Sequence, residues 1–406
     1  MKSCGWTHCF LETVKECLTN LSCFSFFLVA IFFYSFYYAW PYTAQLPDHI
    51  SAVVVDLDNT PVSRELIRGL QAVSQIDVKG VSSNPDSAIR DLKNGKFTTL
   101  ITIPNGFMKD AITGVPTALE LVSNGAFIVK ARSSIAGAAG PLQEIASTAI
   151  AAQLIKQGAP ISTIAASANK PPAVIFQPMY NTVSGYLNFA VPIVFCIIFQ
   201  TVTLAGVGTL INEWFCAKQM PFPLVRAIQS LPYLFALYLP FFCILLFWTL
   251  FIEGASFAWH GINSFQNIPA TLATCVFLSM AVCALALVIA FAFKRANYAV
   301  QTVVLTSLPC VFITGDLFPL QNIPDYMNII AFFIPSTPAV HAMLRASQAG
   351  ASIGQIMPHL LHLLGLTVFY LTIAYLIART YRNDYEVISS PYSLKTVKGQ
   401  TILSSK

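Results

Sequence analysis

Charged residues are scarce in this sequence, and that scarcity limits the class of protein. Asp, Glu, Lys and Arg make up 10% of the 406 residues, whereas hydrophobic residues make up 55%. A soluble domain carries about 25% charged residues, so the deficit predicts an integral membrane protein. The net charge of +5 forms no block of like charge, which argues against a nucleic-acid partner.

Cysteine is missing from the segment between Pro41 and Gly185, although the chain has ten cysteines. That segment therefore cannot depend on disulfides for its stability. No two cysteines have the CxxC spacing of a zinc site, and we expect no metal or other cofactor. The sequence also lacks a GxxxxGK[ST] phosphate-binding loop, so any ATP that drives the protein must be bound by a separate subunit.

Six apolar runs are long enough to cross a bilayer. The expected crossings are 21–41, Leu187–Leu210, Leu231–Ile252, Ala270–Phe293, Tyr298–Ile313 and Leu360–Ile377. Residues 1–20 precede them and have apolar side chains at three- and four-residue steps, namely Trp6, Phe10, Val14 and Cys17, with Leu21 continuing the series. This spacing predicts an amphipathic helix on the cytoplasmic membrane surface, and a plain cytosolic tail is the alternative.

Residues 42–185 have a different character, because short β-branched runs alternate with helical patterns. The expected strands are Ile50–Asp56, Ile76–Val81, Thr98–Ile103 and Ala118–Ser123, and the expected helices are Ser63–Ser74, Pro85–Asn94 and Ile135–Gln157. This alternation predicts a small α/β domain. The fold class is thus a polytopic α-helical membrane protein with six transmembrane helices and an α/β domain inserted between helices 1 and 2.

Basic residues are distributed unevenly between the two sides of the membrane. The residues that would share one side are Lys2, Lys15, Lys218, Arg226, Lys294, Arg295, Arg379, Arg382, Lys395, Lys398 and Lys406. The short loops of the other side contain only Arg345. The positive-inside rule then makes both termini cytoplasmic, including a tail at 381–406, and makes 42–185 extracytoplasmic.

The region 186–380 contains the other five crossings and, at 315–350, a proline-rich interruption. Broken helix at membrane depth is tolerated where protein or a water-lined cavity surrounds it. We therefore expect an outer re-entrant or interfacial hairpin at 315–350.

Two charged residues, Glu213 and Asp316, lie at or near the ends of apolar runs, where charge is costly and indicates function. Polar residues such as Gln200 can line a pathway or bind neighbouring helices together, and we favour the second role. Gly206 and Gly208 allow close helix approach, such as at a dimer interface.

Two motifs in the sequence have a chemical and a structural interpretation. VVVDLDNT at 53–60 is similar to the nucleophile motif of haloacid-dehalogenase-type phosphatases, with Asp56 and Asp58 in the two acidic positions. The closely spaced acidic pair that would hold magnesium is missing, so capping of the following turn is the favoured interpretation. His359 and His362 share a helix face but lack further metal ligands, and we expect them to be interfacial histidines.

The layout as a whole resembles the permease subunits of ABC-2 type exporters. The similar stretches are AVVVDLDNTPVSRELIRGL at 52–70, DLKNGKFTTLITIPNGFMKD at 91–110, MYN at 179–181 and GDLFPLQNIPDYMNIIAFFIPSTPAVHAMLRA at 315–346. The loop NEWFCAKQMPF after the second crossing keeps Glu213 but lacks the Gly-Thr of that family. The mode of coupling there departs from the family pattern.

The resemblance implies a transport subunit in the plasma membrane, a bacterial inner membrane, rather than an enzyme. It implies two permeases, alike or paired with a sister chain, and cytosolic ABC ATPase subunits, with a periplasmic adaptor as a further partner besides the membrane lipids. The substrate is expected to be amphiphilic or drug-like. Coupling to the ATPase would involve Glu213, Trp214, Lys218 and Arg226, and the outer gate would involve Asp316, Phe318 and Pro319.

Three other hypotheses about the function of the protein remain open. The first is a membrane-anchored receptor or scaffold whose external domain binds a ligand or partner without transport. The second is an enzyme that uses Asp56 and Asp58. The third is ion-coupled transport, which the scarcity of intramembrane carboxylates argues against.

Overall fold

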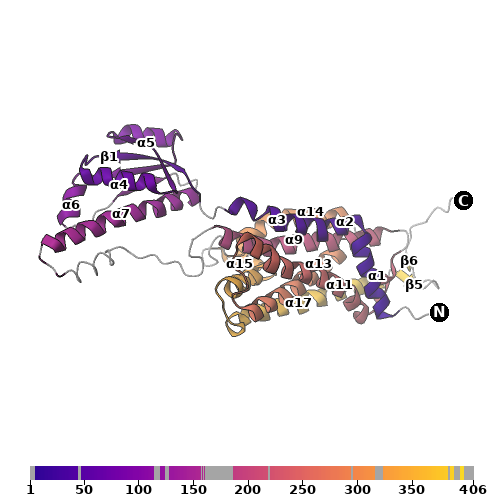
Figure 1. Ribbon diagram of the computed structural model, residues 1–406. Coiled ribbons are helices and arrows are strands. Elements are labelled where there is room, and N and C mark those ends of the chain that lie inside the picture. Colours follow the sequence, from indigo (N-terminus) through magenta and orange to yellow (C-terminus); the bar gives the residue numbers. More distant parts are fainter. Residues whose placement is uncertain are drawn as a thin grey trace. The chain divides into compact units, whose positions relative to one another are not determined.

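The computed structural model divides the chain into two compact units. One unit comprises Met1–Thr43 with Tyr186–Lys406, and the other comprises Ala44–Gly185. The structure describes residues 5–43, 47–113, 119–123, 128–156, 158, 160, 186–217, 220–293, 296–315, 323–382, 385–387 and 394–396. Figure 1 labels the elements, which are described here unit by unit.

The unit at Ala44–Gly185 is built on a four-stranded sheet with the order β2-β1-β3-β4. Its strands are β1 (Ile50–Asp56), β2 (Ile76–Ser82), β3 (Thr99–Ile103) and β4 (Glu120–Ser123), and its helices are α4 (Pro61–Ala72), α5 (Pro85–Lys93), α6 (Phe107–Thr113) and α7 (Ile128–Lys156). Strand β1 pairs in parallel with β2 and β3, whereas β3 and β4 are antiparallel. The expected strands and helices thus lie at their predicted places, except that α7 begins seven residues earlier.

Both faces of this sheet are covered by helices. Leu66 on α4, Phe107 on α6 and Ile145 on α7 belong to a core with Val54 and Ile101 of the central strands. On the opposite face, Ala88 of α5 packs into a second core with Val55 and Leu100. The central strand therefore reads as a nearly continuous apolar run, as expected for a strand buried on both sides.

The other unit is a bundle of long helices. Its elements are α1 (Trp6–Thr19), α2 (Leu21–Phe24), η1 (Ser25–Ala30), α3 (Ile31–Tyr37), η2 (Trp40–Tyr42), α9 (Tyr186–Cys216), α10 (Phe222–Gln229), α11 (Leu231–Phe251), η4 (Ile252–Ser256), α12 (Phe257–His260), α13 (Ile268–Ala292), α14 (Ala296–Ile313), α15 (Asp325–Phe332), α16 (Ser336–Met343), η6 (Leu344–Gln348) and α17 (Ile353–Arg382), followed by the two-stranded ribbon β5 (Tyr385–Val387) and β6 (Leu394–Thr396). Of these, η1, η4 and η6 are π-helical and η2 is a 3₁₀ turn.

Five stretches of the described residues are long and apolar enough to cross a membrane. They are Leu21–Tyr42, Leu187–Cys216, Leu231–His260, Ile268–Ala292 and Ile353–Tyr381. A bent pair, Asp325–Phe332 with Ser336–Gln348, raises the count to six if it forms one span. Helix α14 coincides with the predicted fifth crossing but is not in this set, so its crossing stays a prediction. The protein is nevertheless a multi-pass membrane protein by these spans.

Helix α9 is the central element of the bundle. It packs against α13 on one side and α14 on the other, and it also contacts η1 and α16. Its Gly206 is pressed against the first span, because a Cβ there would lie 2.9 Å from Phe27 Cε2 and 3.2 Å from Phe26 Cβ. The close approach at Gly206 is therefore made within one chain, and the expectation of a dimer contact at this glycine is not needed to explain it.

The bend between α15 and α16 matches the expected interruption. The two helices meet at 82°, with Phe333 to Pro335 between them. Gln200 of α9 stabilises this bend, because its Oε1 accepts a hydrogen bond from Ser336 N at 3.0 Å. Gln200 thus joins two helices of the bundle, which is the role the sequence favoured for it.

Candidate functional site

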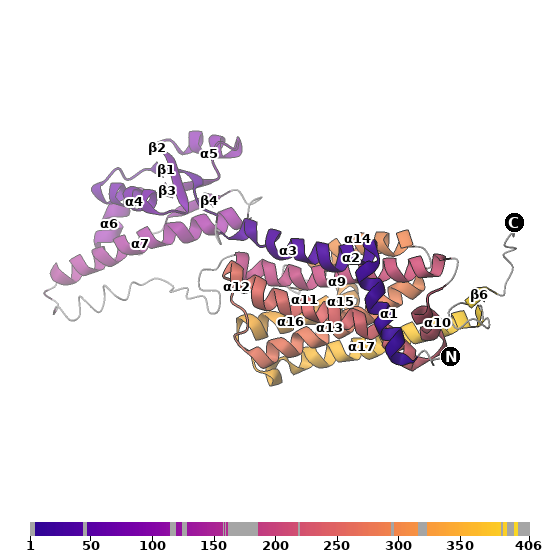
Figure 2. The same ribbon diagram turned by 45° about the vertical axis from the view of Figure 1, so that its right-hand side comes forward.

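Helix α1 is an amphipathic helix that presents three different faces. Its stripe Cys9, Thr13 and Cys17 is buried against the bundle. Leu11 and Leu18 are exposed apolar residues on the far side, at 64% and 56% exposure. Figure 2 shows α1 crossing the bundle beside α10 and α11, which it contacts. The sequence predicted the helix with its apolar stripe toward the membrane surface, and two residues of that stripe, Trp6 and Leu21, are exposed.

The polar flank of α1 carries a row of titratable side chains. His8 Nδ1 lies 3.3 Å from Glu12 Oε2, and Glu16 and Lys15 follow on the same flank. Burial raises the pKa of Glu12, and Glu16 adds to this, while His8 and Lys15 lower it. Burial, and then Glu12, raise the pKa of the Cys9 thiol to about 12, so Cys9 stays protonated at neutral pH. Its Sγ donates to Pro223 O at 3.9 Å.

Asn20 connects α1 to the centre of the bundle. The chain leaves helical geometry at Asn20, whose Oδ1 accepts from Cys23 N at 3.0 Å and so caps α2. The other half of the same amide, Nδ2, donates to Glu213 Oε2 at 2.7 Å. Glu213 lies in the last turn of α9 and is half-buried. One side chain thus fixes the α1–α2 junction and binds a carboxylate of the central helix.

Helix α10 lies beneath α1 and is mostly covered. Six of its eight residues are buried, from Phe222 to Ile228. The ring of His8 meets the ring of Phe222 edge-on at 5.3 Å, and Trp6 Nε1 donates to Pro232 O at 2.9 Å. Arg226 is half-buried, with its guanidinium 5.5 Å from the Phe222 ring centre and 5.7 Å from that of Tyr233. We call α1, Asn20, Glu213 and α10 the α1–α10 cluster.

The residues predicted to couple to a partner lie in different environments. Glu213 and Arg226 belong to the α1–α10 cluster, on separate helices. Trp214 is 4% exposed and packs in the bundle core, so it offers no surface to a partner. Lys218 lies outside the described residues, as do the three residues predicted for an outer gate, Asp316, Phe318 and Pro319.

Histidines near the bent pair have packing roles. His362 Nε2 lies 2.8 Å from Phe332 O, and its ring stacks on Phe332 at 4.2 Å. His359 stacks on His341 at 5.7 Å. Within the described residues no three His, Cys, Asp or Glu side chains gather in a way that could hold a metal ion.

The sequence analysis missed three polar residues of the bundle. Asn20 had a signal, since Asn immediately before an apolar run is typical of an N-cap. Asn212 is fully buried, and neither end of its amide has a partner among the described residues. Glu253 is 1% exposed in the π-helical turn η4, and its Oε2 has no hydrogen-bond partner there. Glu253 was overlooked because the predicted crossing ended at Ile252, whereas the span continues to His260.

Asp56 and Asp58 form a capping network in the unit Ala44–Gly185. Asp56 Oδ1 accepts from Asp58 N and Asn59 N, and its Oδ2 accepts from Ser63 Oγ at 2.7 Å. Asp58 accepts from Thr60 Oγ1 and, across the sheet, from the backbone N–H groups of Gly106 and Met108.

These hydrogen bonds explain the titration of Asp58. Burial raises its pKa, but the hydrogen bonds from Thr60 and from the N–H groups of Met108, Gly106 and Phe107 outweigh burial and lower it. The Asp58 carboxylate therefore occupies the place at the start of α6 where an anionic ligand would bind. This arrangement supports the capping interpretation over the phosphatase.

Comparison with known proteins identifies the family. The family model described as ABC-2 family transporter protein matches residues 21–376. No curated protein matches the chain. The matched range covers the first span, the unit Ala44–Gly185 and the helices from α9 into α17. This protein belongs to the ABC-2 family of transporter proteins, as one of its membrane permeases.

Proposed function

We propose that this chain is the permease subunit of an ABC-2 type exporter. It moves an amphiphilic or drug-like substrate out of the cytoplasm or the inner leaflet, and a separate cytosolic subunit hydrolyses the ATP. Two permeases, alike or paired with a sister chain, form the pathway with two ATPase subunits. Membership of the ABC-2 family supports a partner ATPase. The distribution of Lys and Arg supports cytoplasmic termini and an extracytoplasmic unit at 42–185.

The single observation that carries the coupling proposal is the hydrogen bond from Asn20 to Glu213. A surface helix can pass a movement to the bundle only through a contact that both elements share. Asn20 makes such a contact, because its amide caps α2 and binds Glu213 of α9 at 2.7 Å. ATP binding would shift the bundle between states through different contacts on the polar flank of α1, on Arg226 and on the adjoining loop with Lys218. The outer gate at Asp316, Phe318 and Pro319 is proposed from sequence alone.

The test removes the two ends of this bond in the full-length chain, reconstituted with the ATPase that co-purifies with it. We expect Glu213→Ala and Asn20→Ala to assemble normally and to lose most of the substrate-stimulated ATP hydrolysis. Asn20→Asp should be worse than Asn20→Ala, since it sets two carboxylates against each other. Glu120→Ala, on β4, is the matched control.

The double variant tests whether the two losses arise from one shared bond, and an unchanged melting temperature of each variant separates this proposal from simple loss of stability. If the bond transmits the signal, Asn20→Ala adds little to the loss in Glu213→Ala, because the two effects are not independent. Stimulation that is unchanged in Glu213→Ala would remove the bond from the mechanism. A chain that purifies without any ATPase, yet binds a ligand at its external unit, would be a receptor or scaffold instead.

A further inference from the structure

The unit Ala44–Gly185 has a groove between α4, α6 and α7 that none of the features above explains. Its volume is about 460 Å³, within the range of about 300–1,000 Å³ for small-molecule sites. Helices α4 and α7 pack together in the core of the unit and form two walls of the groove. They approach closely at Gly69, where a Cβ would lie 3.0 Å from Pro141 Cβ. Helix α6 closes the far end with Ala111 and Ile112.

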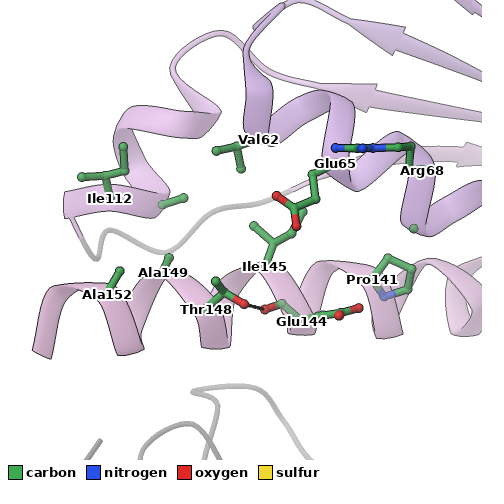
Figure 3. Close-up of a pocket in the computed structure, with 12 residues that line it drawn as sticks. Val62, Glu65, Arg68, Ile112, Pro141, Glu144, Ile145, Thr148, Ala149 and Ala152 are labelled. Carbon is green, nitrogen blue, oxygen red and sulfur yellow. Dashed lines mark hydrogen bonds between the residues drawn. The ribbon is translucent and has the colours of Figure 1, made fainter. Parts of the chain in front are cut away.

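Polar and apolar side chains occupy opposite ends of this groove. Figure 3 shows Val62, Ile112, Ala149 and Ala152 toward one end, with Ile145 on the floor between the helices. Ile112 is 45% exposed, although it belongs to a short helix that packs on the unit. An apolar surface of this kind suits a hydrocarbon chain.

The end near Pro141 carries two carboxylates. Glu65 on α4 points into the gap toward α7, and Glu144 lies on α7 close to Pro141 (Figure 3). Both are exposed, and neither forms an ion pair within the described part of the chain. Arg68 also borders the groove, but its side chain lies along α4 and borders a second hollow that contains Asp56. Two carboxylates and one guanidinium thus line this end of the groove, and its net charge is negative.

We propose that this groove binds an amphiphile with one cationic head and one hydrocarbon tail. An ammonium group lies between the carboxylates of Glu65 and Glu144, and the tail lies along the apolar end at Ala149 and Ala152. The groove would hold such a compound on the outer side during export. That role rests on the proposed function, whereas the binding itself does not.

The experiment measures binding of decylammonium to the full-length chain in nanodiscs, with empty nanodiscs as the background. Hydrogen exchange should show protection within residues 141–152 of α7. Glu65→Gln combined with Glu144→Gln should weaken binding at least tenfold, and Glu120→Gln should not. Decyl sulfate should not protect α7. Affinity should rise about fourfold per methylene from hexyl- to decylammonium, and Ala152→Leu should abolish this dependence because it fills the apolar end.

Several results would overturn the groove proposal. They are no protection of α7, an unchanged dissociation constant in the double variant, equal affinity for decyl sulfate, or crosslinking that places another polypeptide over the groove. Protection of α7 without any effect of decylammonium on ATP hydrolysis would leave the groove in place and count against export. Stimulation of ATP hydrolysis by decylammonium without protection of α7 would support export and overturn the groove as the binding site.

Discussion

Single carboxylates in this chain differ mainly in the groups that surround them. Asp58 is surrounded by hydrogen-bond donors, Glu213 has one strong donor, and Glu253 is buried with an unpartnered oxygen. An unsatisfied buried polar group costs about 1–3 kcal/mol, so Glu253, whose Oε2 has no hydrogen-bond partner among the described residues, lowers the stability of the fold. Intramembrane carboxylates of this kind mark functional positions more often than structural ones.

Asp58 gives a pH-dependent stability that can be measured. Its pKa in the folded chain is below the ordinary value, so its contribution is present above about pH 4 and is lost as the pH falls through the folded value. We expect Asp58→Asn to lower the free energy of local opening at β1 and α6 by about 1–3 kcal/mol at pH 7, since an amide donor would face the N–H donors.

Protection factors from hydrogen exchange, corrected for intrinsic rates, would report this difference. The difference in opening free energy between wild type and Asp58→Asn should narrow as the pH falls below about 4 toward the lowered pKa of the Asp58 carboxyl. Asp86→Asn, in the first turn of α5, serves as the control. A gap that does not depend on pH would show that the Asp58 charge is unimportant.

The sequence predicted the local roles of single residues better than it predicted their hydrogen-bond partners from distant parts of the chain. The capping role of Asp56 and Asp58 followed from a strand end and a turn, which are local features. The partner of Glu213 lies 193 residues away in the chain, and no local pattern joins Asn20 to it. Trp214, which was predicted to couple to the ATPase, is 4% exposed in α9, because this helix continues past the predicted end of the crossing at Leu210 to Cys216.

Helices and strands as whole elements were predicted more reliably, because their signals are periodic. Strand β1 and the helix after it begin and end within two residues of expectation, supported by the capping box of Thr60 and Ser63. The end of α9 and both ends of α17 were missed by several residues, since polar residues at the end of an apolar run do not stop a helix. Helical interruptions such as η4 have no distinctive sequence pattern.

The close contact between α9 and the first span can be tested by substitution at Gly206. Gly206→Leu would force a side chain into Phe27 and Phe26, and overpacking of this kind costs about 1–3 kcal/mol. We expect the variant to melt several degrees below wild type when followed by tryptophan fluorescence in detergent. Gly365→Leu on α17 is the matched control, because a Cβ there meets no atom within 4 Å. Equal melting temperatures for the two variants would contradict a tight η1–α9 contact.

The proposed orientation of the whole molecule in the membrane can be tested by labelling cysteines on its two sides. We expect a membrane-impermeant maleimide to label Glu120→Cys in intact cells, since the unit Ala44–Gly185 has no cysteine of its own and Glu120 is exposed. Cys216, exposed at the end of α9, should react only after lysis. Labelling of both sites in intact cells, or of neither, would contradict the proposed orientation.

The small side chains beneath α1 have a mechanical consequence. Cys9, Thr13 and Cys17 fill the seam where other helices of the bundle insert Phe and Leu. Burial contributes about 0.8 kcal/mol per methylene, so these three side chains stabilise the contact of α1 less than Phe or Leu would at the same positions. The hydrogen bond from Trp6 Nε1 to Pro232 O and the edge-on contact of the His8 and Phe222 rings also hold the start of α1. If a partner subunit docks on α1 as proposed, we expect movement of the lightly packed middle of this helix to reach α9 through the Asn20 amide, which binds Glu213.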